Sequence, residues 1–358
     1  MLRLGFCLPW SSPQMKSLLQ FAALAAAALL AGTGAVRAQT TVPVPGGRVL
    51  KIGHQFPGGT ADAGDFRDRL CRKFAAEVER RTNGSLKFEI YPENKLVRPE
   101  DYIDALQKST MDFVLTPMNN LFAKVPEVAV AQLPGVIRDY NQGLRWKGQP
   151  AGQDLTAALE KNGAIILTWV WEAAGIVSLI RPIIVPDDVR DLRVRGGGKG
   201  IDAVFSAAGA KMLTMPSSDI RPAFRERRLD AAVSASTSLV AFHLEEYCRA
   251  VTTPRNKSIF YFFAPLMISK ATFSTLTPDQ KRIVTEVGAS LEKFALEAVK
   301  ADDEALARAY LASNAAVLDL DEEQWLLWQR FARAASWRDF ERSVPDGAQR
   351  LKNALAVP

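Results

Sequence analysis

The hydrophobic pattern between residues 49 and 116 changes its period repeatedly, and this alternation constrains the fold more than any other feature. Residues 49–54 and 86–91 alternate apolar and polar side chains, which is typical of strands. In residues 65–82 apolar side chains recur every four positions and share one helix face. The predicted order is strand 49–54, helix 65–82, strand 86–91, helix 98–108 and strand 112–116. This order predicts a parallel, doubly wound α/β sheet, in which ligands bind beyond the carboxyl ends of the strands.

The first 38 residues have the composition of a secretory signal. Lys16 supplies the positive flank, and residues 18–31 form an apolar run that is shorter than the roughly 20 residues a membrane span needs. Small residues follow, which predicts cleavage after Ala38. We therefore expect export to the periplasm, with an uncleaved membrane anchor as the alternative. The pattern leaves open whether translation starts at Met1 or Met15.

The charge balance of the chain argues against a nucleic-acid partner. The expected signal carries Arg3, Lys16 and Arg37, and its removal leaves 42 basic and 39 acidic residues, a net charge of +3. A nucleic-acid-binding protein would carry a basic face or stripe. The most basic stretch, residues 221–228, contains Glu226, and we interpret it as a solvated helix face.

The remainder of the chain continues the alternation of strands and helices. Further strands are predicted at 163–169, 175–180, 191–195 and 229–234, and further helices at 201–208, 220–228 and 239–248. Strands 250–253 and 259–269 are expected to return to the first domain. The run Thr277-Pro278-Asp279-Gln280 is a helix start signal. The helix that it begins can extend to about Ser313, which suits a spine along both domains.

These elements predict two domains, which suits a chain of 358 residues at about 150 residues a domain. The expected limits are a signal peptide at 1–38, a first domain at 39–170, a second domain at 171–250, return strands at 251–275 and C-terminal helices, including the spine helix, at 276–358. Cys71 and Cys248 remain after the signal is removed, and the sequence leaves open whether they form a disulfide.

No cluster of residues in the sequence predicts catalysis or a metal. Neither His54 nor His243 has a second ligand at metal-binding spacing, and the nucleophile elbow Gly-x-Ser-x-Gly is absent. The glycine-rich run at 196–200 lacks the spacing of a P-loop, but with Arg195 before it the run can form an anion site. We therefore expect a protein that is not an enzyme and has no cofactor. His54, at the carboxyl end of a strand, is a candidate ligand contact.

A set of short motifs between residues 50 and 290 resembles one protein family. In order, they are Ile52-Gly53-His54, residues 74–84, Tyr91-Pro92 with Leu96, Val185-Pro186-Asp187-Asp188, Leu192-Arg193-Val194-Arg195, Pro216-Ser217-Ser218-Asp219 and Arg228-Leu229-Asp230. The set resembles the dicarboxylate-binding type of solute-binding subunit in tripartite ATP-independent periplasmic (TRAP) transporters. This resemblance implies an α/β fold like that of periplasmic binding proteins: two doubly wound domains around a ligand cleft, with a long C-terminal spine helix.

The resemblance also implies a carboxylate ligand, bound by the arginine that ends the leucine-basic-aliphatic-arginine strand, here Arg195. The chemistry agrees, because a planar guanidinium can donate two parallel hydrogen bonds to a carboxylate. The other expected ligand contacts follow strands or lie at the cleft rim: Asn119, Asn120, Trp171, Glu172, Ser217, Ser234 and His54.

The chain departs from the family pattern at three positions. Ser234 stands where an asparagine is common, and Ser217 stands where an aromatic residue is common. Ile176 or Val177 replaces a second arginine that some members have. These departures predict a pocket that is less charged than a dicarboxylate or sialic acid site.

Together these features predict a periplasmic protein that captures a small organic anion by hinge closure and delivers it to the membrane permease of a TRAP transporter. A binding protein of another transport or sensory system with the same fold is the first alternative. A secreted hydrolase or lyase is the second, and it would need a clustered acid–base pair.

Overall fold

The computed structural model describes residues 47–358, all of which belong to one compact unit. The predicted signal segment and its cleavage after Ala38 lie outside the described residues. Within residues 47–358, no helix is both long enough and apolar enough to cross a membrane.

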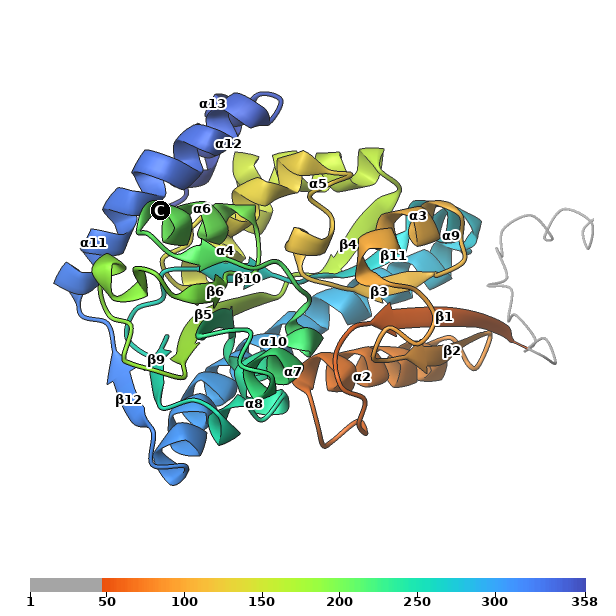
Figure 1. Cartoon of the computed structure of the whole chain (residues 1–358). Coiled ribbons are helices and arrows are strands. Elements are labelled where there is room, and N and C mark those ends of the chain that lie inside the picture. Colours follow the sequence, from red (N-terminus) through yellow and green to blue (C-terminus); the bar gives the residue numbers. More distant parts are fainter. Residues whose placement is uncertain (1–46) are drawn as a thin grey trace, which may run out of the picture. The chain divides into compact units, whose positions relative to one another are not determined.

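The first sheet has five strands in the order β2-β1-β3-β11-β4 (Figure 1). Its strands are β1 (Arg48–His54), β2 (Leu86–Tyr91), β3 (Phe113–Leu115), β4 (Ala164–Thr168) and β11 (Leu266–Ser269). Helices α2 (Phe66–Arg81) and α3 (Tyr102–Gln107) connect the first three strands. Those strands are parallel, which confirms the sequence prediction, whereas β11 is antiparallel to both β3 and β4.

The second sheet has seven strands, and six of them follow the order β12-β9-β5-β8-β6-β7. Its strands are β5 (Trp171–Ser178), β6 (Arg193–Arg195), β7 (Lys211–Met212), β8 (Ala231–Ala235), β9 (Ala250–Thr253), β10 (Tyr261–Phe263) and β12 (Ala316–Asp319). Its helices are α6 (Lys199–Ala207), α7 (Ile220–Arg225) and α8 (Ser236–Ala241). Strands β6, β7 and β8 are parallel, and β5 runs antiparallel to β8 and β9.

Two connections cross between the sheets, and they are bonded to each other. Strand β4 leads through Trp169 and Val170 into β5, and β10 leads through Ala264 and Pro265 back into β11. The N–H of Ala264 donates to the carbonyl of Val170 at 2.9 Å. Because β10 also pairs with β5 and β11 with β4, a two-stranded ribbon joins the two sheets.

The prediction that residues 250–253 and 259–269 both return to the first domain is wrong in part. Strand β9 lies in the second sheet between β12 and β5, and β10 pairs with β5 in that sheet. Of these three strands, only β11 returns to the first sheet. All four residues of β9 are buried, as expected for a strand with neighbours on both sides. The domain limits as a whole stay a prediction.

Helix α10 (Pro278–Ala312) is the predicted spine, and its 35 residues pass both sheets (Figure 1). Its capping box is the one that the sequence predicted, because the N–H of Gln280 donates to Thr277 Oγ1 at 3.2 Å and the N–H of Thr277 donates to Gln280 Oε1 at 3.0 Å. The helix contacts α2 and β4 of the first sheet's layer and α8, β9 and β12 of the second. At Gly288 it approaches Leu167 so closely that an added Cβ would lie 2.8 Å from that residue.

The end of the chain is helical, as predicted, and it packs through tryptophans. Its elements are α11 (Glu322–Phe331), a π-helical segment (Ala332–Trp337), α12 (Arg338–Ser343) and α13 (Gly347–Leu355). Trp328 stacks on Phe205 of α6 with 4.9 Å between ring centroids, and its indole N–H donates to the carbonyl of Ile184 at 2.7 Å. The remaining α-helices of residues 47–358 are α4 (Tyr140–Arg145), α5 (Pro150–Lys161) and α9 (Lys270–Thr275).

The two cysteines of the described chain are both buried and both free. Burial raises the pKa of the Cys248 thiol to about 12 and that of Cys71 well above its ordinary value. The disulfide that the sequence left open is therefore not formed, and both thiols pack as small apolar groups.

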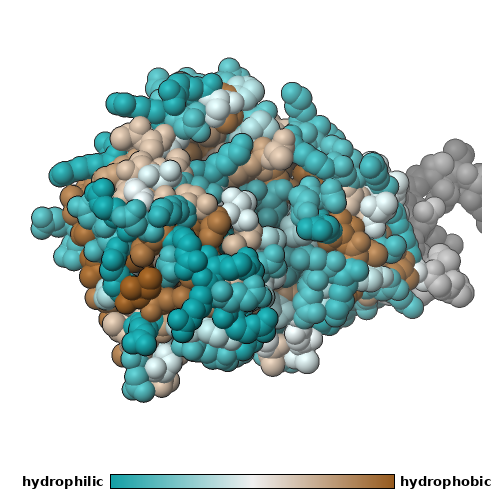
Figure 2. Space-filling model, in the orientation of Figure 1, coloured by the Kyte–Doolittle hydropathy of each residue, from teal (hydrophilic) through white to brown (hydrophobic). Residues whose placement is uncertain are grey.

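The surface carries few large apolar side chains. Hydrophilic residues predominate on the face shown in Figure 2, with hydrophobic residues gathered mainly toward the left. The large hydrophobic residues that are exposed come from separate elements: Val49, Leu96, Ile180, Leu311, Leu326 and Leu355. Single exposed apolar residues of this kind are ordinary for a folded chain.

Candidate ligand-binding site

A small cavity of about 10 Å³ lies between the two sheets, where the carboxyl ends of several strands meet. The residues that line it are Gln55, Phe56, Arg67, Pro117, Asn119, Glu172, Arg195, Ser217, Ser234, Ala235, Ser238 and Phe262. They follow or end β1, β3, β6, β7 and β8, or belong to α2, β5, β10 and the start of α8. The cavity therefore lies at the position that the doubly wound pattern predicted.

Arg195 ends β6 and is only 3% exposed. Its Nε donates to the carbonyl of Met215 at 3.1 Å, and its Nη1 donates to the carbonyl of Val233 at 2.8 Å. Among the described residues, Nη2 has no hydrogen-bond partner. Burial lowers the pKa of Arg195 to about 10, against the opposing effect of the nearby carboxylates of Asp202 and Asp219. The guanidinium is therefore still charged at neutral pH and keeps N–H groups free for an anion.

A second arginine, Arg67 of α2, lines the same cavity and is 1% exposed. It donates to Asp65 at 2.6 Å and 2.9 Å, and Nη1 donates to Glu172 of β5 and Ser238 of α8, both at 3.1 Å. The guanidinium also lies over the ring of Phe56, 3.4 Å from its centroid. Arg67 therefore joins a helix of the first sheet to two elements of the second.

Glu172 is a buried acid with incomplete hydrogen bonding. Its Oε2 accepts from Arg67, but its Oε1 has no partner within residues 47–358. Burial raises the pKa of Glu172 from 4.5 to about 7; Arg67 opposes this rise, and Asp65, Asp302 and Asp303 add to it. Near neutral pH this carboxyl group is therefore divided between its neutral and charged forms.

Five of the eight predicted contacts line the cavity: Arg195, Asn119, Glu172, Ser217 and Ser234. Asn120 does not line the cavity itself, but its Nδ2 donates at 2.8 Å to Oε1 of Gln55, which does. The structure does not bring the other two, His54 and Trp171, to the cavity.

His54 and Trp171 both have partners elsewhere. His54 is fully buried with Nε2 3.1 Å from Asp68, and its Nδ1 accepts from the N–H of Phe56 at 3.3 Å. Trp171 packs its ring against Trp146 and Phe263. The sequence analysis expected these residues near the ligand because they lie next to strand ends. Strand position alone does not show which way a side chain points.

The sequence analysis missed Arg67, Gln55, Phe56, Ser238 and Phe262. Arg67 and Ser238 lie on helices, where a charged or polar side chain is ordinarily assigned to the solvent face. The pair Asp65 and Arg67 at a helix start was the available signal, because an acid at the N-cap can hold a nearby arginine. Arg67 also changes the expectation of a less charged pocket, since it supplies the cavity with a second guanidinium.

A cavity between two sheets, with a buried arginine and a connecting ribbon, is the architecture of a two-domain solute-binding protein. In residues 47–358, no group of three His, Cys, Asp or Glu side chains is placed to hold a metal ion. The arrangement can bind and orient an acid by charge and hydrogen bonds.

Comparison with known proteins agrees with this architecture. Residues 60–342 match the family model of bacterial extracellular solute-binding protein, family 7. The chain is 42% identical to a solute-binding protein of Albidiferax ferrireducens over 291 residues, which cover 81% of this chain and 86% of the relative. It is 23% identical over 261 residues to the C4-dicarboxylate-binding periplasmic protein DctP of Rhodobacter capsulatus, covering 72% and 77% of the two chains.

Among solved structures, the chain is similar to a TRAP periplasmic solute-binding protein of Rhodoferax ferrireducens with bound malonate. The TM-score is 0.83 at 41% identity, and the match covers 85% of this chain and 96% of that one. This chain belongs to the family 7 extracellular solute-binding proteins and is a solute-binding protein of the TRAP type.

Replacing Arg67 by Met should destabilise the fold by about 3–5 kcal/mol, because the change leaves Asp65 and Glu172 buried without their cation. Arg80→Met on the same helix is the matched control, since Arg80 pairs with Glu77 at the surface with 70% of its side chain exposed. The control should leave the stability close to that of the wild type, because an exposed ion pair contributes little. Urea denaturation of the two variants measures the difference, and equal losses would contradict the assigned role of Arg67.

Proposed function

We propose that this protein captures a small organic acid in the periplasm and delivers it to the permease of a TRAP transporter without altering it. The observation that carries the proposal is Arg195, a buried guanidinium held by two backbone carbonyls with N–H groups left for a ligand. No carboxylate forms an ion pair with Arg195 within residues 47–358. A ligand carboxylate would supply that partner at the floor of the cavity.

The cavity is small, which supports a ligand of few atoms that enters when the two sheets move apart. Its free space is about 10 Å³, room for about one water molecule. The Rhodoferax relative holds malonate, a three-carbon diacid. Arg195 would hold one end of such an acid, and Ser217, Ser234 and Asn119 would offer hydroxyl and amide groups along it. The Oδ1 of Asn119 is buried without a partner in the described chain, so it is available to a ligand donor.

Contacts across the cavity support capture by hinge closure. Arg67 and Gln55 belong to the first sheet's side, and they reach Ser238 at 3.1 Å and Ser217 at 3.3 Å on the second. These hydrogen bonds would break if the sheets moved apart along their ribbon. A ligand that bridges both sides would therefore favour the closed arrangement.

We further propose that the exported protein begins at Gln39, after cleavage of the signal at Ala38. The observation behind this is the apolar run of residues 18–31 and the small residues that follow it. The intact mass of protein recovered from the periplasm should correspond to residues 39–358. A mass that includes residues 1–38, or one that begins at Met15, would contradict the cleavage.

Replacing Arg195 by Ala should weaken malonate binding by about 2–5 kcal/mol, which is near a hundredfold at the middle of that range. Calorimetry measures the affinity, and chromatography of the released acid should find it chemically unchanged. Arg193→Ala is the matched control on the same strand, because Arg193 pairs with Asp230 at 2.7 Å and is partly exposed. Unchanged binding in Arg195→Ala, or conversion of the acid, would contradict the proposal.

Malonate affinity should also fall as the pH rises above about 7. Four charged groups face Glu172: Arg67, Asp65, Asp302 and Asp303. Burial is the main cause that raises the pKa of the Glu172 carboxyl to about 7; Arg67 opposes the rise and the three aspartates add to it. The neutral form that can donate to a second ligand carboxylate is therefore lost above that pH.

The test is calorimetry between pH 6.5 and 8.5 on the wild type and on Glu172→Gln. The amide of Gln keeps a donor at every pH, so this variant should lose the dependence while it keeps the affinity. In buffers of different ionisation enthalpy, the wild type alone should take up a proton above pH 7. An identical pH profile for both proteins would remove Glu172 from the ligand site.

A further inference from the structure

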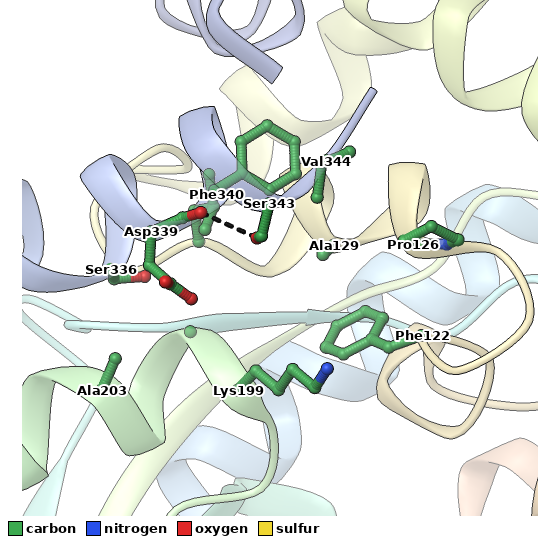
Figure 3. Close-up of a pocket in the computed structure, with 12 residues that line it drawn as sticks. Phe122, Pro126, Ala129, Lys199, Ala203, Ser336, Asp339, Phe340, Ser343 and Val344 are labelled. Carbon is green, nitrogen blue, oxygen red and sulfur yellow. Dashed lines mark hydrogen bonds between the residues drawn. The ribbon is translucent and has the colours of Figure 1, made fainter. Parts of the chain in front are cut away.

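A second cavity, of about 100 Å³, lies behind the glycine loop that follows Arg195 (Figure 3). This space exceeds the roughly 10–15 Å³ that one water molecule needs, so a small organic group can enter it. It is bounded by the segment that follows β3, the start of α6 and residues 336–344 near the chain end. None of its lining residues lines the first cavity.

Most of the wall is apolar and firmly packed. Phe122, Leu133 and Phe340 are 8%, 4% and 4% exposed, and they come from separate parts of the chain. Ala129 and Ala203 are small, and Figure 3 shows their side chains on facing walls. Such a surface suits a hydrocarbon group of four to six carbons better than a polyhydroxylated acid.

Two opposite charges lie on different walls of this space, Lys199 of α6 and Asp339 of α12 (Figure 3). Lys199 is exposed, and its ammonium end points toward Phe122. Lys199, the first residue of α6, forms no ion pair within residues 47–358. Asp339 lies 3.7 Å from Arg342 at the rim, with 61% of its side chain exposed. The two charges are placed on different walls and leave the space between them free.

Ser336 adds a buried polar group that has no partner. It is 2% exposed, and its Oγ forms no hydrogen bond with any described residue. It belongs to the π-helical segment, a rare conformation that is frequent at functional sites. An added Cβ on Gly200 would lie 3.2 Å from this Oγ, so the hydroxyl lies against the first turn of α6. A buried hydroxyl of this kind calls for a partner that a ligand can supply.

We propose that this second cavity binds a small amphipathic zwitterion, an α-amino acid with an apolar side chain. The ligand carboxylate pairs with Lys199, and its ammonium group donates to Asp339 and Ser336 Oγ. The apolar side chain packs on Phe122 and Phe340. A simple anion would leave Asp339 repelling it, and a simple cation would be repelled by Lys199, so the zwitterion satisfies both charges.

This site does not depend on the function proposed for the first cavity, because it uses different residues. The two cavities nevertheless share a wall. An added Cβ on Gly198 would lie 3.2 Å from Asn119, which lines the first cavity, and 3.4 Å from Phe122, which lines the second. The amino acid would therefore bind one layer of residues away from the acid site.

Calorimetry with three matched probes tests the ligand class. L-leucine carries both charges, 4-methylpentanoate lacks the ammonium group, and 3-methylbutylamine lacks the carboxylate. Leucine should bind saturably, and each of the other two should bind about tenfold more weakly because one charged contact is lost. Absence of saturable leucine binding, or equal binding of 4-methylpentanoate, would overturn the proposal.

Four variants locate the binding. Ala203→Phe and Ala129→Phe fill the cavity from opposite walls, so both should abolish leucine binding while malonate binding stays unchanged. Asp339→Asn should reduce the preference for leucine over 4-methylpentanoate about tenfold. Arg195→Ala should leave leucine binding intact. Loss of leucine binding in Arg195→Ala, with normal binding in both cavity-filling variants, would place the amino acid in the first cavity and overturn the second site.

Discussion

The burial of an arginine charge between two sheets is the constraint on which the rest of the structure depends. Arg195 is 3% exposed, and a charge removed from water to this extent needs partners with fixed positions. The carbonyls of Met215 and Val233 supply two of them, and both belong to the second sheet's layer. They orient the guanidinium but carry only part of a negative charge, so the electrostatic compensation stays incomplete. Under the proposed function, the ligand carboxylate completes this compensation, and the cost of burying a charge becomes a preference for acids.

The same logic explains why a second arginine takes a different role. Arg67 faces two carboxylates, Asp65 and Glu172, at hydrogen-bonding distance. The charge of Arg67 is therefore compensated within the protein, and the Arg67 side chain joins the two sheets. Asp302 and Asp303 of the spine helix add to the acid excess and help to raise the pKa of Glu172 to about 7. Glu172 therefore takes part both in the contacts between the sheets and in the protonation of the site.

The sequence predicted the parts of this molecule that depend on local periodicity. The parallel strands β1, β2 and β3, the capping box at Thr277 and the spine helix were all visible in residue spacing. The sequence-based prediction was wrong where a partner distant in the sequence decides the position of a strand or side chain. Strand β9 looks like a crossing segment until β12, more than 60 residues later, pairs with it. Arg67 was missed because helix patterns assign charges to solvent, and His54 was proposed because strand-end position does not reveal that Asp68 holds its ring.

The loop of residues 196–198 shows how one short segment can serve both cavities. Gly197 has a φ of +98°, and a Cβ there would lie 2.8 Å from Arg195 Nη1 and 3.1 Å from the ring of Phe262. Glycine is therefore required for the loop to approach the guanidinium. Gly198 then places the same loop against Asn119 and Phe122 before α6 begins at Lys199. The loop therefore forms part of the wall between the two cavities.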